Sequence, residues 1–231
     1  MDLASFQLLT FDCYGTLVDW EAGITGALRP VLARHGAQRS DEEILSLYAA
    51  LESPLQEGPW LPYREVLARV VDGLARELGF EPSAEERAAL ADSIDGWPVF
   101  PDTVESLRRL GSSRKLGVLS NIDDDLFAST APKLGIDLDL LITAQQVHAY
   151  KPRPAHFEEA LRRSGVPVRG ILHVAQSLFH DIVPARALGF STVWVNRRSG
   201  RAGSGATPPA DGLPDLEVPD LATLADLLEE A

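Results

Sequence analysis

Hydrophobic positions follow two patterns that alternate along most of this chain. Short apolar runs without polar alternation are typical of strands buried on both faces of a parallel sheet, and they occur at 6–12, 115–120, 138–143, 170–176 and 191–196, with a shorter one at 215–218. Segments with helical spacing lie between and after these runs, at 102–111, 125–135, 154–165, 181–189 and 219–231. The alternation predicts a Rossmann-like α/β fold, with a doubly wound parallel sheet and a ligand site at the carboxyl ends of the strands.

Residues 21–97 break this alternation. Helical spacing recurs there without a strand-like run, at 21–36, 40–53, 63–79 and 83–94. Two of these helices open with a Ser followed three residues later by Glu, which is the pattern of a capping box. We therefore predict an all-helical cap formed by residues 20–97, inserted into a catalytic core formed by residues 1–19 and 98–231.

The ends of the core helices carry their own signals. Asp102 is a predicted N-cap, and a glycine that can take the left-handed C-cap conformation closes each of the first four core helices, at Gly111, Gly135, Gly165 and Gly189. A stretch rich in Gly, Ser, Pro and Ala at 199–214 predicts an irregular loop.

Composition narrows the classes of function. The 231 residues carry a net charge of −13, which argues against a nucleic-acid or anionic-membrane surface, because either needs a basic footprint. With Cys13 as the one cysteine, no intrachain disulfide forms. No apolar run approaches the ~20 residues that span a bilayer, and the first residues lack the pattern of a secretory signal. We expect a cytoplasmic protein.

Polar residues gather where the predicted strands end, and in a doubly wound sheet these ends meet in one crevice. They are Asp12, Tyr14, Gly15 and Thr16 after the first strand, Ser120 and Asn121 at the second, Lys151 after the third, and Gln176, Ser177 and Asp181 after the fourth.

Each of these residues has a chemical and a structural interpretation. Asp12 is a candidate covalent nucleophile, since carboxylates serve in that role, and the Gly-Thr pair after it favours this over a simple turn cap. Lys151 is a candidate to neutralise an anionic substrate and to keep Asp12 ionised, or it is a surface lysine. Ser120 and Asn121 can donate to an oxyanion or carboxylate or form a turn. Asp181 can orient Lys151 or a water, or cap a helix.

Four short segments together resemble the motifs of the haloacid dehalogenase superfamily. They are DCYGT at 12–16, LSN at 119–121, YKPRPAHF at 150–157 and AQSLFHDI at 175–182. The helical insertion lies between the first two motifs, where this superfamily places one class of cap domain. The resemblance therefore covers the whole chain and implies the same core-and-cap fold.

Two substitutions indicate the branch within this superfamily. Its phosphatases carry a second Asp as general acid where this chain has Tyr14, and commonly an acidic magnesium ligand where it has Gln176. The chain is instead similar to the 2-haloacid dehalogenase (type II) branch, which implies a hydrolase without metal or other cofactor that acts on small organic acids, among them (S)-2-haloacids. A phosphatase of the same superfamily and a non-catalytic relative that binds small anions are the alternatives.

The resemblance also implies roles for individual residues. Asp12 would displace halide and form an aspartyl ester, with Thr16 supporting it. Lys151, Ser120 and Asn121 would hold the substrate carboxylate, and Asp181 with Ser177 would position the hydrolytic water. Tyr14 would lie on the substrate side of the cleft. Apart from the resemblance, Trp20 is a candidate to line the cleft between cap and core, with plain packing as the alternative.

The chain departs from the family pattern at the position that binds the departing halide. The family's cap arginine is absent, and Leu47 lies near its expected place. Our hypothesis is that Arg64 replaces it from another helix, and the alternative is that Arg64 is a surface arginine. The aromatic residues Trp60, Tyr63 and Trp97 are further candidates for the cleft between cap and core. The expected partner is a small anionic molecule, not a nucleic acid or a membrane, and the sequence leaves open whether the chain forms a homodimer.

Overall fold

The computed structural model describes residues 1–200 and 205–231, and its strands form one parallel sheet. In the described residues this sheet has six strands in the order β3-β2-β1-β4-β5-β6, and every neighbouring pair is parallel. The strands are β1 (Leu8–Phe11), β2 (Lys115–Ser120), β3 (Leu140–Thr143), β4 (Ile171–Ala175), β5 (Ser191–Val195) and β6 (Leu216–Val218). The predicted α/β fold is therefore confirmed.

Several strands are shorter than the apolar runs that predict them. The first run begins at Phe6, which is buried although it lies outside β1. Hydropathy reports burial, whereas a strand is defined by its hydrogen-bonded ladder, so the two need not end at the same residue.

Helices cover both faces of the sheet. The helices α5 (Thr103–Gly111), α6 (Asp124–Leu134) and α10 (Leu221–Glu229) share an apolar cluster with Leu9 of β1, whereas α8 (Ala155–Ser164) and α9 (Val183–Ala187) share another with Leu8. Successive residues of a strand point to opposite faces, so the two clusters lie on the two sides of the sheet. The short helix α7 (Ala144–Val147) follows β3.

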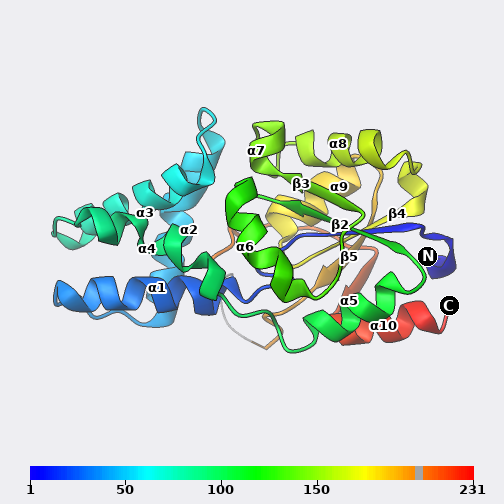
Figure 1. Ribbon diagram of the computed structural model, residues 1–231, viewed down its shortest axis with the longest axis horizontal. Coiled ribbons are helices and arrows are strands. Elements are labelled where there is room, and N and C mark those ends of the chain that lie inside the picture. The colour runs from blue at the N-terminus through cyan, green and yellow to red at the C-terminus, as the bar shows by residue number, and fades with distance from the viewer. Residues whose placement is uncertain (201–204) are drawn as a thin grey trace.

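The cap consists of the helices between β1 and α5, and it lies at the end of the core opposite both termini (Figure 1). These helices are α1 (Trp20–Arg34), α2 (Asp41–Glu57), α3 (Tyr63–Leu78) and α4 (Ala84–Ser93), followed by the turn η2 (Ile94–Gly96). Both predicted capping boxes are present, Ser40 with Glu43 and Ser83 with Glu86. The division at residues 19/20 and 97/98 stays a prediction, although α1 begins at Trp20.

The predicted helix ends agree with the structure better than the predicted caps do. Gly135 and Gly165 end their helices in the left-handed conformation, whereas Gly111 is the last residue of α5 but does not adopt that conformation, and Ser112 is the C-cap. Asp102 does precede α5, yet its carboxylate makes no bond to that helix and pairs instead with Arg197 and the backbone N–H of Leu221. Tertiary partners therefore override the local capping signal.

The helix predicted at 181–189 also differs. A π-helical turn, η4 (Leu178–Ile182), precedes α9, and Ser177 caps it by accepting a hydrogen bond from the N–H of His180. The loop predicted at 199–214 is described only in part, because 201–204 lie outside the described residues.

Polar contacts hold the cap against the core. The carboxylate of Asp123 accepts hydrogen bonds at 2.9 Å from the first two backbone N–H groups of α3, which otherwise lack partners at a helix N-terminus. Lys133 donates to three carbonyl groups at the end of the cap, and Arg153 donates to two carbonyl groups at the end of α2. These contacts place α2 and α3 over the carboxyl ends of the strands. In the described residues no helix is both long and apolar enough to cross a membrane.

Candidate active site

A buried lysine joins two carboxylates at the carboxyl end of the sheet. Lys151 is 1% exposed, and its Nζ donates to Asp12 Oδ1 at 2.9 Å, to Asp181 Oδ1 at 2.6 Å and to the carbonyl of Leu119 at 2.8 Å. These bonds use all three protons of the ammonium group. Asp12 follows β1, Lys151 follows α7 and Asp181 lies in η4, so the fold brings together residues that are far apart in the sequence.

The charges in this cluster stabilise one another. Burial alone would lower the pKa of Lys151, but Asp12 and Asp181 outweigh it and raise that pKa. Burial would raise the pKa of Asp181, but Lys151 and His173 outweigh it and lower that pKa to about 2. Burial raises the pKa of Asp12, and Lys151 opposes this shift. The cluster therefore holds a permanent ammonium between carboxyl groups, as a buried charge requires.

The Gly-Thr pair fixes the second oxygen of Asp12. The hydroxyl of Thr16 donates to Asp12 Oδ2 at 2.8 Å and accepts from the backbone N–H of Gln176 at 2.9 Å. Gly15 has a φ of +98°, and a Cβ there would lie 2.9 Å from the indole nitrogen of Trp20. A larger residue would strain this turn, so Gly15 allows the chain to bend between Asp12 and Thr16.

His173 and Asp181 form a second buried pair. The ring Nε2 of His173 lies 3.0 Å from Asp181 Oδ1, and its Nδ1 lies 3.0 Å from the hydroxyl of Thr10. Since a carboxylate can only accept, Nε2 donates to Asp181. The other oxygen of Asp181, Oδ2, is buried and has no hydrogen-bond partner among the described residues.

Asn121 links the lysine loop to the cap. Its side-chain oxygen accepts from the backbone N–H of Lys151 at 2.7 Å, and its Nδ2 donates to the Lys151 carbonyl and to Gln56 Oε1, both at 3.1 Å. The neighbouring Ser120 hydroxyl is buried and unpartnered within the part of the chain that the structure describes. Asn121 therefore positions Lys151, while the Ser120 hydroxyl stays open to a ligand.

Other predicted residues pack around the same space. The phenol of Tyr14 forms a 2.8 Å hydrogen bond with the Thr130 hydroxyl. The Ser177 hydroxyl, besides capping η4, lies 3.1 Å from the ring Nδ1 of His180. Burial lowers the pKa of His180 to about 4, so this imidazole is neutral at neutral pH.

The cap contributes a polar cluster that the sequence analysis missed. Glu52 of α2 accepts hydrogen bonds from Gln56 Nε2 at 2.6 Å and from the Tyr63 hydroxyl at 3.1 Å, and burial raises the pKa of Glu52 to about 7. The sequence does contain a signal for this cluster, namely a spacing of four residues. That spacing places Ile44, Tyr48, Glu52 and Gln56 on one buried face of α2. The predicted helix ended at residue 53, whereas α2 continues to residue 57, so this face was cut short.

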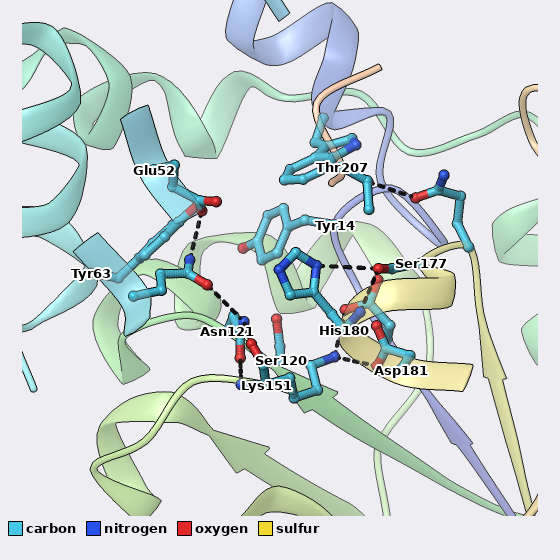
Figure 2. A pocket seen from close by; sticks show the side chains of 14 residues that line it. Tyr14, Glu52, Tyr63, Ser120, Asn121, Lys151, Ser177, His180, Asp181 and Thr207 are labelled. Carbon is cyan, nitrogen blue, oxygen red and sulfur yellow. Dashed lines mark hydrogen bonds and ion pairs between the residues drawn. The ribbon is translucent and has the colours of Figure 1, made fainter. Parts of the chain in front are cut away.

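One cavity lies between the core and the cap (Figure 2). Its core wall is formed by Asp12, Tyr14, Ser120, Asn121, Lys151, Gln176, Ser177, His180 and Asp181, together with Thr207, and its cap wall is formed by Trp20, Glu52, Gln56 and Tyr63. The free volume is about 30 Å³, which is room for only a few water molecules. An organic substrate therefore needs the cap or the lining side chains to move.

The cavity gathers most of the predicted site residues. Asp12, Tyr14, Trp20, Ser120, Asn121, Lys151, Ser177 and Asp181 all line it, and Thr16 lies directly behind Asp12. Sequence reasoning gave no site role to four of the lining residues, Glu52, Gln56, His180 and Thr207. Of the aromatic candidates, Trp20 and Tyr63 reach the cavity, whereas Trp60 and Trp97 are not among its lining residues.

Arg64 is the predicted site residue that the structure does not bring to the cavity. Its guanidinium group pairs with Asp92 at 3.0 Å and Asp125 at 2.9 Å, and its side chain is 47% exposed. Successive helical residues point about 100° apart, so when Tyr63 faces the cavity its neighbour turns toward the surface. The expectation that Arg64 replaces the cap arginine is therefore corrected.

The residues of the core wall do not form a metal-binding set. In the described residues no group of three or more His, Cys, Asp and Glu side chains is placed to hold a metal ion. The Lys151 ammonium lies between the two carboxylates that would be nearest to a cation, and it would repel that cation. Catalysis without a metal remains a prediction.

Comparison with known proteins places this chain in a family. A family model described as a haloacid dehalogenase-like hydrolase matches residues 6–189, and the chain belongs to that family of hydrolases. Its full-length similarity points to one branch: an (S)-2-haloacid dehalogenase of Pseudomonas sp. (strain YL) is 28% identical, over 96% of this chain and 94% of that protein.

Solved structures support the same architecture. A defluorinating L-2-haloacid dehalogenase superposes with a TM-score of 0.82 and 24% identity, covering 97% of this chain and 95% of the other. The L-2-haloacid dehalogenase from Xanthobacter autotrophicus, with chloropropionic acid covalently bound, gives a TM-score of 0.77 and 22% identity, covering 97% and 98%. At these identities the likeness concerns the fold.

Proposed function

We propose that this protein is a hydrolase of small organic acids that forms an ester on Asp12, with (S)-2-haloacids as the model substrates. The observation that carries the proposal is the arrangement of Asp12, whose two oxygens are held by Lys151 and Thr16 at the edge of the buried cavity. Fixed hydrogen bonds orient a carboxylate for attack without further reorganisation. The similarity to (S)-2-haloacid dehalogenases supports the choice of substrate.

In the first step, a carboxylate oxygen of Asp12 attacks the carbon that carries the leaving group. The new oxygen–carbon bond forms as the carbon–halogen bond breaks, and the halogen leaves as halide with both bonding electrons. Halide needs no proton from a general acid, which fits Tyr14 at a position without acidic character: burial raises the pKa of its phenol well above the usual value. The substrate carboxylate would lie against Ser120 and Lys151.

In the second step, water attacks the ester carbonyl of Asp12. The open oxygen of Asp181, whose pKa is about 2, accepts a hydrogen bond from that water. Cleavage of the bond between the Asp12 carbonyl carbon and the ester oxygen, with transfer of one proton from the water to that oxygen, releases the hydroxy acid. The second proton passes to solvent, and Asp12 keeps one oxygen atom from water. Lys151 stabilises the negative charge that develops on the carbonyl oxygen.

The test of this mechanism follows the oxygen atom. A single turnover of (S)-2-chloropropionate in H₂¹⁸O should place ¹⁸O in the peptide that contains Asp12, and not in the lactate released by that first turnover. Asp12→Asn should release no halide, whereas the exposed control Asp2→Asn should match the parent protein.

Parallel assays separate the alternatives. Halide release should continue after exhaustive EDTA treatment. Label in the lactate alone would overturn the ester mechanism, and release of phosphate from phosphate esters in preference to halide would make the protein a phosphatase.

A further inference from the structure

The Glu52 carboxyl group is buried with one oxygen left open. Its side chain extends from α2 toward the cavity (Figure 2), and the residue is 2% exposed. Oε1 accepts from Gln56 and Tyr63, while Oε2 has no hydrogen-bond partner among the described residues. An unsatisfied buried polar atom is destabilising, so its presence at a cavity needs a chemical reason.

The neighbouring hydroxyl groups keep Oε2 open. The hydroxyls of Tyr48 and Tyr63 lie 2.8 Å apart, so one of them donates to the other, and they lie 3.4 Å and 3.1 Å from Oε1. The hydrogen bonds that reach Glu52, from the tyrosine hydroxyls and the Gln56 amide, all end on Oε1. Oε2 therefore either carries a proton or presents its lone pairs to a ligand.

Two further open atoms lie on the opposite wall. The Ser120 hydroxyl and Asp181 Oδ2 are also buried without a hydrogen-bond partner in the described residues, and both residues line the same cavity as Glu52. Open polar atoms on facing walls favour a ligand with polar groups at both ends. A simple 2-haloalkanoate has such a group only at its carboxylate end.

The charges determine which polar group fits beside Glu52. The residues lining the cavity include three acids, Asp12, Glu52 and Asp181, and one permanent cation, Lys151, whose three donors are already engaged. A halide or second carboxylate at the cap wall would find no cation there. A hydroxyl group can donate to ionised Glu52 or accept from its protonated form, and an ammonium group pairs with the ionised form.

We propose that Glu52 determines substrate specificity by bonding through Oε2 to a hydroxyl or ammonium group of the substrate, so that the enzyme takes small carboxylic acids with such a group at their cap-facing end. This inference rests on the proposed function for the orientation of the substrate, with its carboxylate at the core wall. Here Glu52 touches substrate but takes no part in bond cleavage.

Binding of three inert acids tests the proposal. Calorimetry at pH 8 should compare propionate, 3-hydroxypropionate and 3-aminopropionate, which differ only in the group at C3. The parent protein should bind the hydroxy or the amino acid at least ~10-fold more tightly than propionate, since a pocket built around a polar partner rejects the analogue that lacks it. Glu52→Leu should abolish that preference, and the exposed control Glu57→Leu should retain it.

The conservative variant distinguishes the two donor groups and guards against misfolding. Glu52→Gln should still bind 3-hydroxypropionate but lose affinity for 3-aminopropionate by ~10-fold or more, because the amide keeps the hydrogen bond and removes the charge. If Glu52→Leu does not fold, the Glu52→Gln comparison decides between the two groups, and the preference of the parent protein still tests the proposal.

Three outcomes would overturn the inference. They are equal affinity of the parent protein for all three acids, a preference that survives in Glu52→Leu, and no detectable binding of any of the acids. Because these acids lack a leaving group, selectivity is measured without turnover. Selective binding without ¹⁸O transfer to Asp12 would reject the proposed function alone, and ¹⁸O transfer without selectivity would reject this inference alone.

Discussion

The core wall and the cap wall of the cavity both bury carboxyl groups, but they satisfy them in different ways. On the core wall, Asp12 and Asp181 share the ammonium group of Lys151. On the cap wall, Glu52 is surrounded by the neutral donors Gln56 and Tyr63. A buried cation favours the ionised carboxylate, whereas neutral donors only partly offset burial.

The difference in pKa follows from this arrangement. The pKa of Asp181 is lowered to about 2, while that of Glu52 is raised to about 7. Asp181 on the core wall therefore stays ionised at every physiological pH, as its proposed contact with the hydrolytic water requires. The cap wall changes its protonation state near neutral pH, which suits contact with a polar ligand group.

Removing the core cation should have the largest effect. Lys151→Met leaves two buried carboxylates side by side and should lower the free energy of unfolding by about 3–5 kcal/mol at pH 7, with loss of halide release. The destabilisation should shrink toward pH 4, where the unpaired carboxylates take up protons. Urea unfolding measures this, with the exposed lysine in Lys115→Met as the control. Equal stability of the two variants would contradict a charge-paired core wall.

Glu52→Gln tests the cap wall by the pH dependence of stability. A carboxyl group with a folded pKa near 7 and an unfolded value of 4.5 binds its proton more tightly when folded. Protonation of this group therefore stabilises the folded state fully below pH 4.5, and this stabilisation is lost as the pH rises to 7.

Over that range the parent protein should therefore lose about 3 kcal/mol relative to Glu52→Gln. Chemical denaturation at several pH values gives the difference, with the exposed Glu57→Gln as a control on the same helix. Parallel pH curves for the parent protein and Glu52→Gln would show that Glu52 ionises freely in the folded state.

Asp123→Ala should loosen the contact between the cap and the core. Its carboxylate accepts from the first two N–H groups of α3, and losing such a cap costs about 1–2 kcal/mol. Hydrogen exchange of the Tyr63 and Arg64 amides should speed up accordingly. Asp125→Ala, two residues on and exposed, should leave those amides protected. Unchanged exchange in Asp123→Ala would mean that the cap is held elsewhere.

Arg64→Ala should have the smallest effect. Its ion pairs with Asp92 and Asp125 are at the surface, where such pairs contribute about 0–1 kcal/mol. Steady-state kinetics of halide release should stay within about twofold of the parent protein. A large rise in KM with unchanged stability would instead place Arg64 at the substrate and would restore its predicted role on the cap wall.

The sequence by itself determined the order of strands and helices, the helical insertion and most of the core wall. Burial on both faces of a strand and the amphipathic spacing of a helix are local signals. A residue at or just after the end of a parallel strand must lie at the carboxyl edge of the sheet, so Asp12, Ser120 and Ser177 had to lie at the same edge once the sheet formed. The pairing of Asp181 with His173 needed the structure, because a buried histidine shows no partner in sequence.

Only the tertiary structure decided the cap wall. A helix side chain faces the cavity or the solvent according to the rotation of the helix, which changes by about 100° per residue, and long-range contacts such as those of Asp123 fix that rotation. Arg64 therefore points outward while its neighbour Tyr63 points inward, and Glu52 reaches the cavity from a helix that the sequence analysis ended too early. The chemistry that distinguishes this cavity depends on packing between segments distant in sequence, which local patterns do not encode.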